Sequence, residues 1–67
     1  MLSKKLQELR IKSKLSMRKA GAEIGVTESS MCLYESGKRY PSSGVLVELA
    51  KLYKVNIDWL LEGEFED

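Results

Sequence analysis

Apolar residues recur at every third or fourth position along most of this chain, which is the spacing of one face of an α-helix. In the first segment, Leu2, Leu6 and Leu9 share such a face, and Ser3 is placed to act as the N-cap. No stretch alternates between apolar and polar residues as a half-buried strand does, so we predict no β-strand. The pattern therefore predicts an all-α fold.

Capping residues and glycines divide the middle of the chain into two short helices. Ser16 and Thr27 are suited to begin helices, because a hydroxyl side chain can accept from the free N–H groups of a first turn. Gly25 and Gly37 are suited to end them in the left-handed conformation. The short connection makes the two helices meet at a sharp angle, and Gly21 lets their backbones come close, which is typical of a helix-turn-helix. We expect the helices at residues 17–24 and 28–36, and the whole unit at about residues 16–36.

The last third of the chain predicts a strongly apolar helix over residues 43–53, after Pro41. Val45, Val47 and Leu52 widen its main stripe until the helix is apolar almost all round. Such a helix is either central in the fold or in contact with a second subunit. The main stripe consists of Leu46, Leu49, Ala50 and Tyr53.

A fifth, short helix is predicted over residues 57–62, with Asn56 as its N-cap and Gly63 at its end. The chain has 67 residues and contains no repeat or linker-like segment. We therefore treat residues 1–67 as a single domain, with a short acidic tail at residues 63–67.

The expected helix over residues 28–36 has two different sides. At roughly 100° per residue, Ser30, Met31 and Tyr34 fall together and resemble a core stripe. The opposite side should face solvent, because its side chains are mostly short or polar. These residues are Glu28, Ser29, Cys32, Leu33 and Ser36.

The charges are distributed unevenly along the chain. Residues 1–44 hold nine basic and four acidic side chains, a net charge of +5. Residues 45–67 hold two basic and six acidic side chains, a net charge of −4. The first part is suited to bind a polyanion, whereas the second part is not.

Residue content argues against several classes of protein. With one cysteine, Cys32, and no histidine, neither an internal disulfide nor an ordinary structural zinc site is expected, and we expect no cofactor. Without histidine or a Gly-rich phosphate loop, we do not expect an enzyme. No apolar run is long enough to span a bilayer and no signal-peptide pattern follows Met1, so we expect a cytoplasmic protein.

Two stretches, LSMRKAGAEIGVTESSMCLYESGKRYP and LVELAKLYKVNIDWLL, resemble the Cro/C1-type helix-turn-helix family of phage-repressor-like and XRE-like proteins. The resemblance covers nearly all of residues 2–63. It implies a compact five-helix fold of the lambda-repressor type. It also implies a sequence-specific transcriptional regulator, most of all a repressor. Such a protein binds a two-fold operator in double-stranded DNA as a homodimer, with the third helix in the major groove. The matching positions are Leu15, Ser16, Gly25, Val26, Thr27, Met31, Glu35, Gly37 and Pro41.

The resemblance also implies roles for individual residues. Arg10 of the first helix should form an ion pair with Glu35, so Glu35 serves the fold rather than the DNA. Base contacts are implied at Glu28, Ser29, Cys32 and Leu33. Phosphate contacts are implied at Ser16, Met17, Arg18, Thr27, Lys38, Arg39, Tyr40, Ser42 and Ser43.

Three departures from the family pattern affect these expectations. Met17 replaces a usual glutamine that contacts phosphate. Ala20 and Gly21 replace a larger Leu-Ala pair, which should loosen the packing there. Lys54 lies where glycine or asparagine is frequent at the end of the fourth helix.

Some residues keep a second interpretation. Glu28 can serve only to complement the dipole at the start of its helix. Cys32 is more consistent with a small packing residue than with a redox switch. The apolar residues in excess of the core stripe form a candidate homodimer surface, although the tryptophan can instead lie flat on its own domain. This surface consists of Trp59, Leu52, Val45 and Phe65.

The main alternative function is a protein-interaction module, such as the antitoxin or antagonist partner in a toxin–antitoxin or phage regulatory system. The acidic second half of the chain and the outward position of Leu33 allow it. The basic character of residues 16–43 favours DNA.

Overall fold

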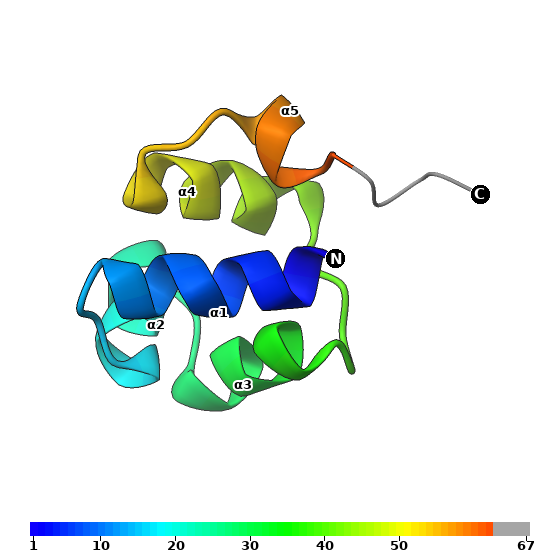
Figure 1. Cartoon of the computed structure of the whole chain (residues 1–67). Coiled ribbons are helices and arrows are strands. Elements are labelled where there is room, and N and C mark those ends of the chain that lie inside the picture. Colours follow the sequence, from blue (N-terminus) through cyan, green and yellow to red (C-terminus); the bar gives the residue numbers. More distant parts are fainter. Residues whose placement is uncertain (63–67) are drawn as a thin grey trace.

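The computed structural model describes residues 1–62, and that part of the chain contains five α-helices and no strand. The all-α prediction is therefore confirmed. In Figure 1, α1 crosses the middle of the view, with α4 and α5 on one side and α3 on the other. No helix within residues 1–62 combines the length and the hydropathy needed to cross a bilayer. The helices are α1 (Leu2–Lys12), α2 (Met17–Ile24), α3 (Glu28–Ser36), α4 (Ser43–Tyr53) and α5 (Ile57–Leu60).

The boundaries of α2 and α3 follow from the predicted caps. Ser16 Oγ accepts from the Lys19 N–H at 3.0 Å, and Thr27 Oγ1 accepts from the Ser30 N–H at 3.0 Å. Gly25 and Gly37 end the helices in the left-handed conformation, with φ values of 79° and 80°. Both helices therefore begin and end at the predicted residues.

Two predicted boundaries are wrong. Ser3 is not an N-cap, because α1 begins at Leu2 and Met1 occupies the cap position without a side-chain cap. Leu2 is buried in the core, and its packing places the start of the helix before the serine. Helix α5 ends at Leu60 rather than at residue 62, although Asn56 Oδ1 caps it as expected by accepting from the Asp58 N–H at 2.7 Å. Gly63 lies outside the described residues.

One hydrophobic core holds the helices together. Its largest fully buried side chains are Leu6, Met31, Leu49 and Leu60, each from a different helix. The predicted α4 stripe is buried along its whole length. The core therefore requires α4 to lie centrally, and of the three residues that widen its stripe only Val47 is largely exposed.

The close approach of α2 to α3 depends on a glycine. A Cβ atom at Gly21 would lie 2.7 Å from the Val26 carbonyl oxygen and 3.2 Å from Met31 Cγ. A heavier residue would therefore force the backbone of the turn away from α2. The expectation that the packing is loosened is wrong at Gly21, because the turn closes directly onto this residue, and Ala20 is fully buried.

Candidate nucleic-acid interface

Helix α3 presents a distinct outer side. Met31 and Tyr34 fix it to the core, with 1% and 7% of their surface exposed. On the opposite side Glu28, Ser29, Cys32 and Ser36 are exposed, whereas Leu33 is half-buried. The outer side is therefore polar and made mainly of short side chains, which permits close approach by another molecule.

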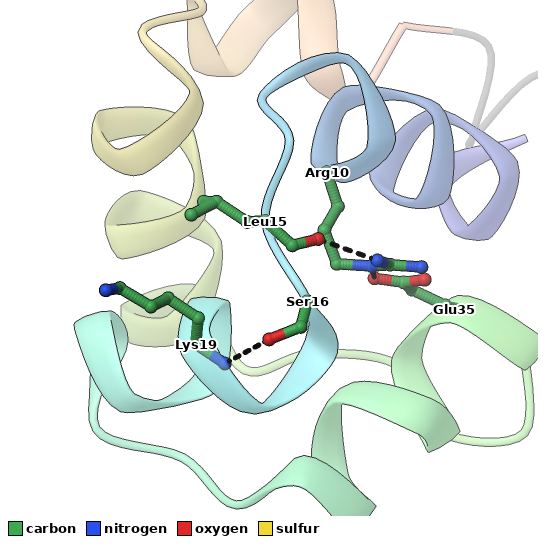
Figure 2. Close-up of polar contacts among 5 residues, drawn as sticks. All are labelled: Arg10, Leu15, Ser16, Lys19 and Glu35. Atoms are coloured by element: carbon green, nitrogen blue, oxygen red, sulfur yellow. Dashed lines mark hydrogen bonds and ion pairs between the residues drawn. The ribbon is translucent and has the colours of Figure 1, made fainter.

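An ion pair between α1 and α3 fixes the position of this helix, as Figure 2 shows. Arg10 Nε donates to Glu35 Oε2 at 2.8 Å, and the Glu35 side chain is only 3% exposed. Arg10 Nη1 also donates to the Leu15 carbonyl at 2.8 Å. One guanidinium therefore links α1, the segment before α2, and α3, and the expected Arg10–Glu35 pair is present.

The charges of this pair act on a buried phenol at the end of α4. Burial, and to a lesser extent the negative charge of Glu35, raise the pKa of Tyr53 to about 12, while the charge of Arg10 acts in the opposite direction. The hydrogen bond to Glu35 raises the pKa of Arg10, so its guanidinium stays charged. Tyr53 therefore lies within electrostatic range of both members of the pair.

The start of α2 offers donors to an anion. The first N–H groups of a helix lack partners within the helix, and its dipole favours negative charge there. Arg18 and Lys19 are exposed at this end, next to the cap residue Ser16. Lys19 was not among the predicted contacts, although its place in the first turn of the helix could have indicated it.

Two of the predicted phosphate contacts have other roles in the structure. The Met17 side chain is half-buried and packs against the core, so only its backbone N–H remains available to a phosphate. Thr27 Oγ1 accepts from the Ser30 N–H and donates to Ser30 Oγ at 3.1 Å. The hydroxyl of Thr27 thus serves the helix cap, although the residue is exposed.

The segment after α3 carries exposed cations beside that helix. The N–H groups of Lys38 and Arg39 both donate to the Leu33 carbonyl, at 3.0 and 3.2 Å. This folds the backbone against the end of α3 and leaves both side chains exposed. Further along, Tyr40, Ser42 and Ser43 are also exposed, and Ser42 Oγ caps α4 by accepting from the Val45 N–H at 3.3 Å.

Exposed cations lie on both sides of α3 in the sequence. Arg18 and Lys19 lie at the start of α2, and Lys38 and Arg39 follow α3. The acidic residues Asp58 and Glu62 belong to the α5 region, which lies on the other side of α1 from α3 (Figure 1). The arrangement can attract an anionic surface to α3 and keep it away from α5.

The candidate dimer residues have different environments. Trp59 is 44% exposed, and Lys5 Nζ lies 4.6 Å from its ring centroid while donating to the Trp59 carbonyl at 2.7 Å. Val45 and Leu52 are half-buried against the core of their own domain. Phe65 lies outside the described residues. The Lys5–Trp59 contact carried no signal in the sequence, because the two residues are 54 positions apart.

Comparison with known proteins gives consistent matches. A family model described as helix-turn-helix matches residues 6–60. The chain is 31% identical over 64 residues to the uncharacterized HTH-type transcriptional regulator YqaE of Bacillus subtilis (strain 168), covering 96% of this chain and 55% of that protein. It is 38% identical over 61 residues to the similarly described YobD of the same organism, covering 91% of this chain and 54% of YobD.

Two further matches extend this comparison. The HTH-type transcriptional activator BcrR of Enterococcus faecalis is 36% identical over 62 residues, covering 92% of this chain and 30% of that protein. The chain thus spans about half the length of the two Bacillus relatives and less of BcrR. The crystal structure of the P22 c2 repressor with a synthetic operator matches with a TM-score of 0.89 at 24% identity, covering 94% of this chain and 96% of that one. This last similarity establishes the fold.

Proposed function

Because this chain belongs to the Cro/C1-type helix-turn-helix family, whose model matches residues 6–60, we propose that it is a DNA-binding transcriptional regulator. Helix α3 enters the major groove of double-stranded DNA, and the residues on either side of it bind the phosphates. The observation that supports this proposal best is the outer side of α3, which is largely exposed, made mainly of short or polar side chains, and flanked in the sequence by exposed cations.

Base recognition is assigned to the outer side of α3. Glu28 can accept from the N4 amino group of cytosine, and Leu33 can contact a thymine methyl group. Ser29 can donate or accept at most bases, so it contributes less discrimination by itself. Glu28 also repels phosphates, which weakens binding to unrelated DNA and improves selectivity.

Phosphate binding is assigned to the cations and free N–H groups around α3. The side chains of Arg18, Lys19, Lys38 and Arg39 supply charge, and the start of α2 supplies N–H donors. These contacts hold the protein in register on the duplex without selecting its sequence. Each cation that neutralises a phosphate should contribute about one unit to the slope of the logarithm of affinity against the logarithm of salt concentration.

We also propose that the protein binds as a homodimer on a two-fold operator, because one helix in one groove recognises few base pairs. Trp59 is the exposed aromatic residue of α5 and our candidate for the contact. Val45 and Leu52 support α4 from within their own domain, so they contribute less than the sequence suggested. Sedimentation equilibrium of wild type and Trp59→Ala tests this: equal masses exclude Trp59 from the interface, and a monomer throughout excludes the dimer.

We propose that the protein represses transcription in the cytoplasm, since a bound homodimer blocks access to the DNA that it covers. One relative, BcrR, is described as an activator, so the direction of regulation needs its own measurement. A reporter gene placed behind a selected site distinguishes the two: repression lowers its expression, whereas activation raises it.

Selection of binding sites from a pool of random duplexes tests the proposed function itself. We expect enriched sites with two-fold symmetry, whose half-sites lie about one helical turn apart. Binding to the enriched site should weaken steeply as salt increases. A protein that binds no duplex even at low salt would instead act as a protein-interaction module.

A further inference from the structure

The Arg10–Glu35 pair leaves one carboxylate oxygen unused. Glu35 Oε2 accepts from Arg10, but Oε1 is buried and has no hydrogen-bond partner among residues 1–62. A buried carboxylate oxygen without a partner loses the hydrogen bonds that water gave it in the unfolded chain. Native proteins rarely leave such an atom unsatisfied, so Oε1 is expected to accept a hydrogen bond in solution.

A second buried polar atom also lacks a hydrogen-bond partner within residues 1–62. This atom is the hydroxyl oxygen of Tyr53. A phenol is an efficient donor, and a carboxylate oxygen is a strong acceptor. The two groups are close enough for the charge of Glu35 to act on the Tyr53 phenol. The two unsatisfied atoms thus complement each other chemically.

We propose that the Tyr53 hydroxyl donates a hydrogen bond to Glu35 Oε1, so that Tyr53 joins Arg10 and Glu35 in one hydrogen-bond network. The bond forms either through one ordered water or after a small rotation of the two side chains. Buried waters typically bridge polar atoms that have no other partner, and they can join groups that are slightly too far apart for a direct bond.

This hydrogen bond connects residues of three different helices. Glu35 belongs to α3, Arg10 to α1, and Tyr53 is the last residue of α4. Only Lys54, Val55 and Asn56 separate Tyr53 from α5. Tyr53 therefore acts as a positioning residue that links the α4–α5 end of the domain to the outward helix α3. The consequence for DNA depends on the proposed function, but the hydrogen bond itself does not.

The sign of one mutational effect tests the bond. If Tyr53 is the donor, Tyr53→Phe leaves Glu35 Oε1 unsatisfied and raises the equilibrium constant of unfolding by roughly tenfold to a hundredfold. If the Tyr53 hydroxyl makes no hydrogen bond in solution, the same change removes a buried unsatisfied group. The equilibrium constant of unfolding is then unchanged or lowered. Urea unfolding of both proteins at neutral pH measures the difference, and an unchanged or lowered constant overturns the proposal.

A background without the ion pair is the matched control. Arg10→Met with Glu35→Leu replaces the pair by apolar side chains, an exchange that buried ion pairs often tolerate. Tyr53→Phe in this background should have no unfavourable effect, because the acceptor is gone. An equal loss in both backgrounds would show that Tyr53 acts through packing and would overturn the proposal.

Nuclear magnetic resonance on the unmodified protein keeps the proposal testable if a variant does not fold. We expect the Tyr53 hydroxyl proton to be protected from exchange, and the Arg10 Nε–H signal to shift in Tyr53→Phe because the charge of Glu35 is redistributed. An Overhauser contact between the Tyr53 ring and a long-lived water indicates the bridged form, and its absence indicates the direct bond. A rapidly exchanging hydroxyl with an unmoved Arg10 signal overturns both forms.

Discussion

Substitution of Gly21 by alanine tests the close contact between α2 and the turn before α3. In a helix interior, glycine to alanine normally stabilises a protein by about 1 kcal/mol. At Gly21 the new methyl group would lie 2.7 Å from the Val26 carbonyl oxygen, a backbone atom that cannot rotate away. Overpacking of this kind costs about 1–3 kcal/mol, so the net effect should be a destabilisation of up to about 2 kcal/mol.

Gly44 is the matched control for this substitution. It lies near the start of α4, and a Cβ atom there would meet no other atom within 4 Å. Gly44→Ala should therefore stabilise the domain by about 0.5–1 kcal/mol. The two substitutions make the same chemical change and differ mainly in the space around the new methyl group.

Urea unfolding followed by helical circular dichroism measures both effects. A domain of this size has roughly 3–10 kcal/mol of stability, so opposite changes of this magnitude are easily resolved. We expect the unfolding midpoint to fall for Gly21→Ala and to rise for Gly44→Ala. If Gly21→Ala raised the midpoint as much as Gly44→Ala does, the argument from the 2.7 Å contact would be refuted.

Three further predictions concern the end of α4, the Tyr53 phenol and the proposed DNA-contacting residues. Lys54 ends α4 with φ at 56°, so Lys54→Gly should stabilise the domain by about 1 kcal/mol in thermal unfolding, whereas Lys51→Gly within the helix should destabilise it. The pKa of Tyr53 is raised to about 12 from its usual 10. The folded state therefore favours the neutral phenol, and this stability is complete below about pH 10 and lost as the pH rises towards about 12. Tyr53→Phe should abolish that part of the alkaline decline in urea unfolding measured at increasing pH; a decline unchanged in the variant would contradict it. Lys38→Ala should weaken binding to all duplexes about equally and reduce the salt slope by about one unit, whereas Leu33→Ala should change the preferred base. The reverse outcome in binding titrations would show that the two surfaces are wrongly assigned.

Local interactions explain why the helices could be predicted from the sequence. A cap bond such as that of Ser16 with the Lys19 N–H joins residues three positions apart, and the left-handed glycines act on their own turn. The apolar spacing likewise identifies one face of a helix without reference to its neighbours. This is why the inward side of α3, with Met31 and Tyr34, was identified correctly.

The candidate site was less completely predictable. The outward positions of Glu28, Ser29 and Cys32 follow from the helical period, and these residues are exposed. The partner of Glu35 came from the resemblance to a family rather than from spacing, because Arg10 lies 25 positions away. The inward packing of Met17 was missed, since the side of α2 that faces the core depends on where α4 lies.

The sequence by itself thus determined where α2, α3 and α4 begin and end, which sides are apolar and where the charges gather. Those properties depend on backbone hydrogen bonds and side-chain spacing within a few residues. Only the tertiary structure decided how closely the turn before α3 approaches Gly21, that Lys5 covers the ring of Trp59, and that Tyr53 lies within range of the charge on Arg10. Such contacts depend on the angles and distances at which helices cross, and those emerge only when the whole core packs at once.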